Sequence, residues 1–122
     1  MSGATPHDSV QRSVARCLEL EDIECRLRKL RDRLECLCAP INSVARPFVA
    51  RWGELEHIEC GLRELRGRLD RLHAQIEGEV TNAKQRRLEH RAVGETQGRL
   101  KDAFEWLEQV KSLLFKRYGG RA

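Results

Sequence analysis

A long internal repeat constrains the fold of this chain more than any other feature of its sequence. Residues 20–41 (LEDIECRLRKLRDRLECLCAPI) align without a gap on residues 55–76 (LEHIECGLRELRGRLDRLHAQI), and 14 of the 22 positions are identical. The offset of 35 residues equals five heptads, so both copies keep the same phase of a seven-residue pattern. A tandem duplication of one helix is the simplest explanation.

Apolar residues recur in both copies at alternating spacings of three and four residues. This spacing assigns them to the a and d positions of a heptad, and the flanking e and g positions are almost all charged, polar or glycine. An amphipathic helix on a globular core would show a wider apolar stripe. The pattern therefore predicts coiled-coil-like packing and self-association through one assembly seam, called the seam below, which consists of Leu20, Ile23, Leu27, Leu30, Leu34, Leu37, Leu55, Ile58, Leu62, Leu65, Leu69, Leu72 and Ile76.

The charges beside the seam predict how the two helices are oriented. In each copy the e and g positions begin acidic and finish basic, so a parallel pair would bring like charges together. Antiparallel packing instead brings Glu24 towards Arg66 and Arg31 towards Glu59. Such exposed pairs select the orientation, while the apolar seam provides the stability. A hairpin within one chain and an antiparallel homodimer both satisfy this pattern.

Proline, glycine and the loss of the seam set the predicted boundaries. Pro40 ends the first helix, Pro47 suits the start of the second, and the Gly119-Gly120 pair ends the third. Between Gly78 and Gly94 the a and d positions carry Glu79, Arg86 and His90, so a continued helix and a hinge both remain open there. We expect a flexible N-terminus over 1–8, one elongated helical domain over 9–118 with helices at about 9–38, 47–77 (or to 92) and 96–117, and a tail over 119–122.

The C-terminal segment is richer in apolar residues than one a/d stripe requires. Residues 104–118 contain four of the six aromatic side chains of the chain. A helix of this kind either completes a three-helix core or presents a surface to a partner protein. The residues predicted to do so are Leu100, Phe104, Trp106, Leu107 and Leu114. The predicted fold is therefore all-α: an antiparallel coiled-coil-like hairpin plus a third C-terminal helix.

No pattern in the sequence points to catalysis. Charged residues make up 34% of the chain and aromatic residues only 5%, a composition typical of long helices. Phosphate-binding loops, nucleophile motifs and the H-E-x-x-H zinc motif are missing, and the four histidines occur in unrelated settings. We therefore predict no catalytic residue, no cofactor and no small-molecule substrate.

The cysteines do not predict a metal site or a disulfide framework. Cys36, Cys38, His57 and Cys60 are candidate zinc ligands, but their heptad positions point away from a shared seam and C-x-C is an unusual spacing. Five cysteines form an odd set, and nothing indicates secretion or a membrane span. A protein in the cytoplasm or nucleus, without a bound metal, is expected.

Two functional hypotheses follow from the helical pattern. The first is a non-enzymatic oligomerisation or adaptor protein that binds itself, as a dimer or tetramer, and another protein. The alternative is a small protein that binds double-stranded RNA by its shape, as some viral proteins do, because arginine-rich helix faces can track phosphates. Its candidate contacts are Arg28, Arg31, Arg63, Arg66, Arg71, Arg86 and Arg87. Interleaved acidic residues and a net charge of only +4 favour the first hypothesis.

Overall fold

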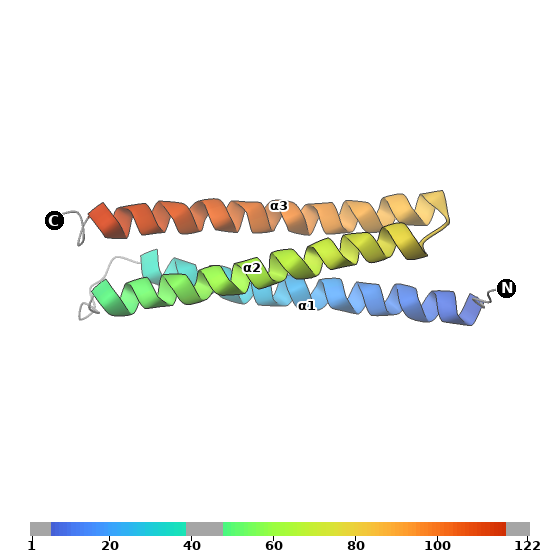
Figure 1. Ribbon diagram of the computed structural model, residues 1–122, viewed down its shortest axis with the longest axis horizontal. Helices are drawn as coiled ribbons and strands as arrows, with labels where there is room; N and C mark the ends of the chain where they lie inside the picture. Colours follow the sequence, from blue (N-terminus) through green and yellow to red (C-terminus); the bar gives the residue numbers. More distant parts are fainter. Residues whose placement is uncertain (1–5, 39–47, 117–122) are drawn as a thin grey trace.

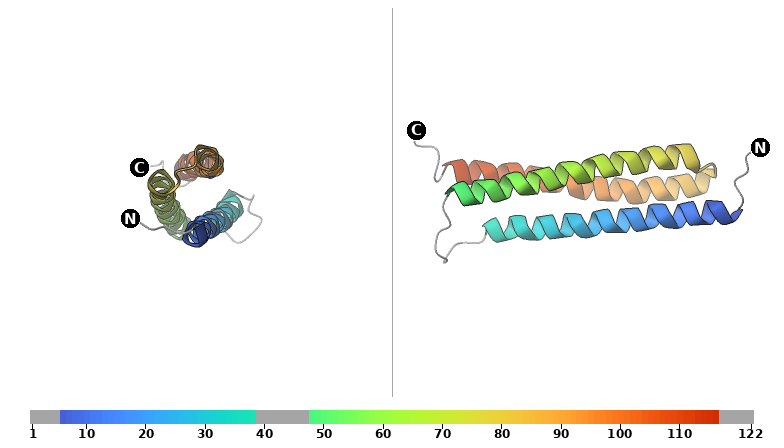
Figure 2. Two further views of the ribbon diagram at one scale, coloured as in Figure 1. Left: turned by 90° about the vertical axis from the view of Figure 1, so that its right-hand side faces the viewer. Right: turned by 60° about the horizontal axis from the view of Figure 1, so that its bottom comes forward.

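Three long helices account for nearly all of the residues that the structure describes. The computed structural model describes residues 6–38 and 48–116, and within these ranges it contains helices α1 (Pro6–Cys38), α2 (Phe48–Glu79) and α3 (Ala83–Leu114) and no strand (Figure 1). Successive helices run in opposite directions, with α2 between α1 and α3 (Figures 1 and 2). The all-α hairpin with a third helix is thus confirmed. The predicted connector with Pro40 and Pro47, and the predicted tail, lie outside the described residues.

The seam forms the interior of this single chain. Ten of its thirteen residues are buried, and Leu20, Leu30 and Leu37 are partly buried against them. All seven seam residues of α2 are buried because α2 packs against both other helices, whereas α1 and α3 contact each other less. The hairpin therefore closes within one chain, and in this structure the seam packs against α1, α2 and α3 of the same molecule. The self-association predicted through it stays a prediction.

The antiparallel orientation of α1 and α2 is confirmed, but the predicted ion pairs are wrong. Among the ion pairs that join these helices are Arg33 with Glu54 and, at 2.8 Å, Arg68 Nε with Glu19 Oε2. Three of the four side chains expected to pair between α1 and α2 contact α3 instead. Glu24 accepts from Thr96 and Arg99, Glu59 binds Lys111, and Arg66 lies over the Phe104 ring. The third helix thus contacts residues that flank the seam on both α1 and α2.

The third helix begins at Ala83, well before the predicted start near Thr96. Asn82 caps it, since its side-chain Oδ1 accepts a hydrogen bond of 3.0 Å from the backbone N–H of Gln85. The sequence carries this signal as Asn82 followed three residues later by Gln85, but the polar residues at the seam positions obscured it. The segment from 78 to 94 is therefore helical except at residues 80–82.

The C-terminal aromatic helix completes the core, as one of the two predicted alternatives states. Leu100 and Leu107 are buried, and Phe104, Trp106 and Leu114 are partly buried against the core. The buried side of α3 also includes Val93, Thr96, Ala103 and Val110, of which only Val93 occupies an a or d position in the heptad phase of the seam. Because α3 packs mainly on α2, its buried side is set by the shape of α2 rather than by a strict heptad.

Replacing Gly98 with alanine is expected to stabilise the protein. Gly98 is exposed in the middle of α3, and a Cβ added there meets no atom within 4 Å. Alanine in a helix interior is favoured over glycine by about 0.5 to 1 kcal/mol. Urea unfolding monitored by circular dichroism should show this increase. Gly61→Ala is the control, since its added Cβ would lie 2.9 Å from Leu30 Cδ1, and a Gly98→Ala variant no more stable than this control would contradict the placement.

Candidate interaction surface

The outer side of α1 carries an apolar stripe that the bundle does not use. Val10, Val14 and Leu18, named the α1 stripe here, are 61%, 51% and 58% exposed. Their spacing of four residues places them on one side of the helix. The core residues of α1, such as Ile23, lie on the opposite side. Three exposed aliphatic side chains in a row are therefore available to another surface.

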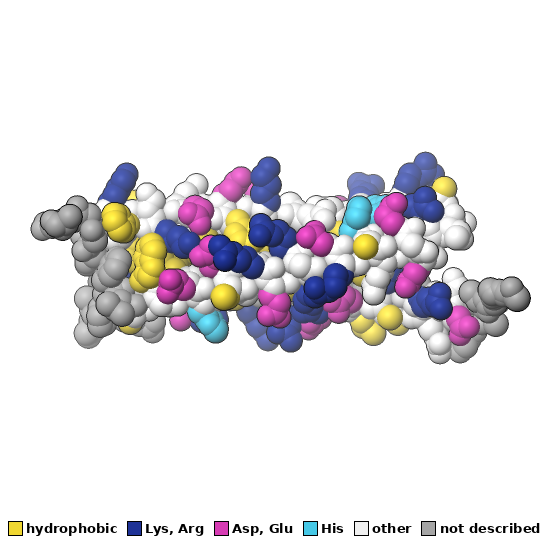
Figure 3. Space-filling model, viewed as in Figure 1, with side chains coloured by type: hydrophobic (Ala, Val, Ile, Leu, Met, Phe, Trp, Pro, Cys, Tyr) yellow, Lys and Arg dark blue, Asp and Glu magenta, His cyan; other side chains and the backbone are white. Residues whose placement is uncertain are grey.

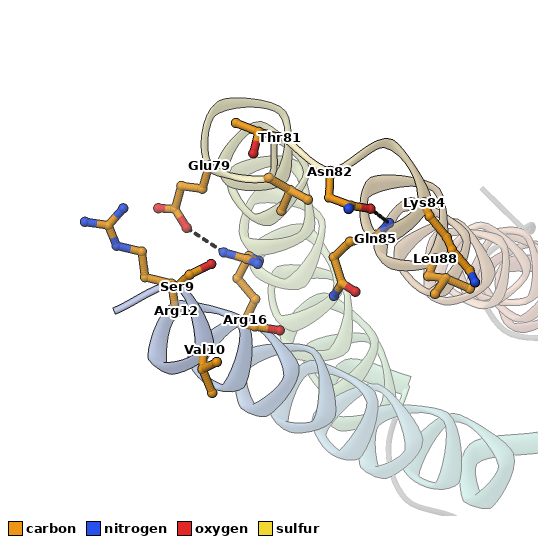
Figure 4. A pocket seen from close by; sticks show the side chains of 12 residues that line it. Ser9, Val10, Arg12, Arg16, Glu79, Thr81, Asn82, Lys84, Gln85 and Leu88 are labelled. Carbon is orange, nitrogen blue, oxygen red and sulfur yellow. Dashed lines mark hydrogen bonds and ion pairs between the residues drawn. The ribbon is translucent and has the colours of Figure 1, made fainter. Parts of the chain in front are cut away.

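A cavity of about 730 Å³ opens at the end of the bundle, where the start of α1 meets the turn between α2 and α3. Figure 4 shows its lining, in which Val10 and Leu88 are the large apolar side chains labelled among mostly polar ones. Leu88 is as exposed as the α1 stripe. Exposed apolar side chains are thus present at this cavity on both α1 and the first turns of α3.

Arg16 connects all three helices beside this cavity. Its side chain is buried, and its Nε donates to Glu89 Oε1 at 2.6 Å while Nη1 donates to Glu79 Oε1 at 2.7 Å. The hydrogen bond from Arg16 lowers the pKa of Glu89, and a second one from Gln85 adds to this effect. No sequence motif singles out Arg16, although extending the seam backwards from Leu20 assigns it to a d position. The three-way ion pair fixes the start of α1 against the α2–α3 turn.

The seven arginines proposed for nucleic-acid binding do not form one uniform surface. Three have roles within the fold: Arg63 pairs with Glu59, Arg66 lies over Phe104, and Arg86 donates to the carbonyl of Val80. The other four, Arg28, Arg31, Arg71 and Arg87, are exposed, as are Arg63 and Arg66. On the face seen in Figure 3, basic and acidic side chains alternate along the bundle. The arginines that sequence analysis grouped are therefore distributed over three helices.

A second, smaller apolar area lies at the C-terminal end of α3. Leu113 and Phe115 are exposed there, at the opposite end of α3 from Leu88.

Four of the cysteines face outwards. Cys17, Cys25, Cys36 and Cys60 are exposed free thiols, and the side chain of Cys38 lies outside the described residues.

Two further observations bear on the class of the protein. None of the helices within residues 6–38 and 48–116 is both long and apolar enough to cross a membrane. Comparison of the chain with protein-family models, with curated proteins and with solved structures gives no match.

Proposed function

We propose that this protein is a non-enzymatic protein–protein interaction module that associates with a second copy of itself through the α1 stripe. The observation that carries the proposal is the exposure of Val10, Val14 and Leu18 along one side of α1. Exposed aliphatic residues that follow one another along a helix are typical of interaction sites, whereas isolated ones are not. The seam is occupied within the chain, so association requires another surface.

The spacing of the α1 stripe favours a second copy as its partner. Val14 lies midway between Val10 and Leu18 in the sequence. If two α1 helices pack antiparallel about a two-fold axis at Val14, Val10 of each chain lies opposite Leu18 of the other. The stripe is therefore self-complementary, which a symmetric dimer interface requires. Because it is short, we expect a dimer with a dissociation constant that is roughly micromolar or weaker.

Val14→Glu is expected to prevent this association without unfolding the chain. The substitution puts two carboxylates next to each other at the centre of the interface and should raise the dimer dissociation constant at least about tenfold. Sedimentation equilibrium over a range of protein concentrations measures the effect, and circular dichroism checks that the helices persist. Leu113→Glu is the control because Leu113 is also exposed but lies at the other end of the molecule from Val14.

Two results would contradict the proposal. One is a wild-type protein that stays monomeric at concentrations well above micromolar. The other is a dimer that Val14→Glu leaves intact. Ultraviolet absorbance of the purified protein tests the alternative function, nucleic-acid binding. An excess at 260 nm that is removed by salt would assign Arg28, Arg31, Arg71 and Arg87 to nucleic-acid binding instead.

A further inference from the structure

Two histidines and a glutamate that are distant in the sequence meet between α2 and α3. His73 and Glu77 are four residues apart on α2 and therefore lie on the same side of that helix. The chain reverses at residues 80–82, and α3 returns along α2, which brings His90 to the same level. The histidines were predicted to occupy unrelated settings, and for His73 and His90 that prediction is wrong because their contact depends on the path of α3.

The three side chains are close enough to share one ion. One ligand atom from each of them lies within 4.8 Å of the other two. The imidazole rings of His73 and His90 have centroids 4.4 Å apart, and Nε2 of His90 contacts Oε2 of Glu77. Zinc binds nitrogen and oxygen ligands at about 2.0 to 2.2 Å, so two of its ligands are separated by about 3 to 4 Å. Small side-chain rotations would bring all three ligand atoms around one ion.

The surroundings leave one side of this cluster open to solvent. The side chain of His90 is 23% exposed and that of Glu77 is 54% exposed. His73 is exposed as well. Nδ1 of His90 is buried and has no hydrogen-bond partner among the described residues, so no second hydrogen bond fixes the ring. Because Glu77 and His73 are exposed, a water molecule can reach an ion held here.

We propose that His73, Glu77 and His90 form a binding site for a divalent transition-metal ion of the zinc type, held by two imidazoles and one carboxylate with a further position for water. Imidazole and carboxylate together suit Zn²⁺, Co²⁺ and Ni²⁺, whereas Ca²⁺ and Mg²⁺ prefer oxygen ligands alone. Among the described residues, these three form the one group of histidine, cysteine, aspartate or glutamate side chains whose ligand atoms converge. The group contains no cysteine.

An ion in this site would connect α2 to α3. Two of its ligands belong to α2 and the third to α3, on either side of the turn at residues 80–82. The folded chain presents the ligands together and the unfolded chain does not, so binding stabilises the folded state. The thermal midpoint should therefore rise with the concentration of zinc.

The test uses the reduced, purified chain after treatment with a chelator. Isothermal titration calorimetry with ZnCl₂ measures binding, thermal unfolding with and without ZnCl₂ measures the stabilisation, and MgCl₂ is the control ion. We expect His73→Gln and Glu77→Gln each to weaken zinc binding at least about tenfold. His57→Gln is the matched control, since His57 is an exposed histidine of α2 outside the cluster.

The exposed thiols require a second measurement, because cysteine also binds zinc. Titration with Co²⁺ distinguishes the two, since thiolate ligands give an intense near-ultraviolet charge-transfer band that nitrogen and oxygen ligands lack. A cobalt complex without this band, lost in His73→Gln, is the expected result. Failure of zinc to raise the thermal midpoint, binding unchanged in both His73→Gln and Glu77→Gln, or a thiolate band in the cobalt complex would each overturn the proposal.

Discussion

Replacing Leu65 with aspartate is expected to unfold the protein rather than to separate two folded chains. Leu65 lies in the middle of α2, is 2% exposed and belongs to the core that all three helices share. A carboxylate there would be buried without a partner, in addition to the lost packing. The lost packing of about 2 to 5 kcal/mol and the buried charge together should cost an amount comparable with the total stability of about 5 to 15 kcal/mol of a typical domain.

Circular dichroism and urea unfolding test this expectation. Leu65→Ala should remain folded and lose about 2 to 5 kcal/mol, since it only removes packing. Gln75→Asp introduces the same carboxylate at an exposed position of α2 and should cost well under about 1 kcal/mol. A Leu65→Asp protein that keeps its helices and its thermal midpoint would show that this side of α2 faces solvent.

Replacing Arg16 with methionine is expected to have the second largest effect. Methionine keeps much of the apolar volume but leaves the carboxylates of Glu79 and Glu89, which are 33% and 15% exposed, without their shared cation. Losing charged hydrogen bonds in this partly buried setting should cost roughly 2 to 3 kcal/mol of the free energy of unfolding. Arg26→Met removes an exposed ion pair within α1 and should cost at most about 1 kcal/mol.

The effect of Arg16→Met should also depend on pH. Because the pKa of Glu89 in the folded protein lies below its ordinary value of 4.5, the ion pair stabilises the fold above that pH and loses this contribution as the pH falls further. Urea unfolding of wild type and variant should therefore show a difference that is full at neutral pH and shrinks below about pH 4.5. A difference that stays constant into acid would mean that Arg16 acts through packing alone.

The sequence predicts the interior of this fold better than its contacts between charges. Every seam residue of α2, including Leu65, is buried, because strict heptad spacing leaves one side of a helix to pack. The antiparallel direction follows from the charge gradient, yet Glu24 and Glu59 bind α3 because a third helix competes for the flanks of the first two. When one helix packs against two others, its own sequence does not show which of the two each charged side chain contacts.

The beginning of α3 and the His73–His90 contact show two different limits. The Asn82 cap has a local signal in the sequence, but Glu79, Arg86 and His90 interrupt the apolar pattern around it. Polar residues are tolerated there because this end of the bundle is held by ion pairs such as that of Arg16 with Glu89. The meeting of His73 with His90, in contrast, exists only once α3 has folded back on α2, so spacing along one helix could not predict it.

Two of the ion pairs between α1 and α2 are related to each other by the internal repeat. Arg33 of the first copy and Glu19, which directly precedes that copy, correspond to Arg68 and Glu54 at the same offset of 35 residues. The pairs Arg33–Glu54 and Arg68–Glu19 are therefore one contact made twice, with the copies exchanging roles. A chain with a single copy has the residues to make both contacts with an identical chain. Duplication converts such an encounter between separate molecules into an internal one, at an effective concentration of about millimolar, so the hairpin no longer depends on how much protein the cell makes.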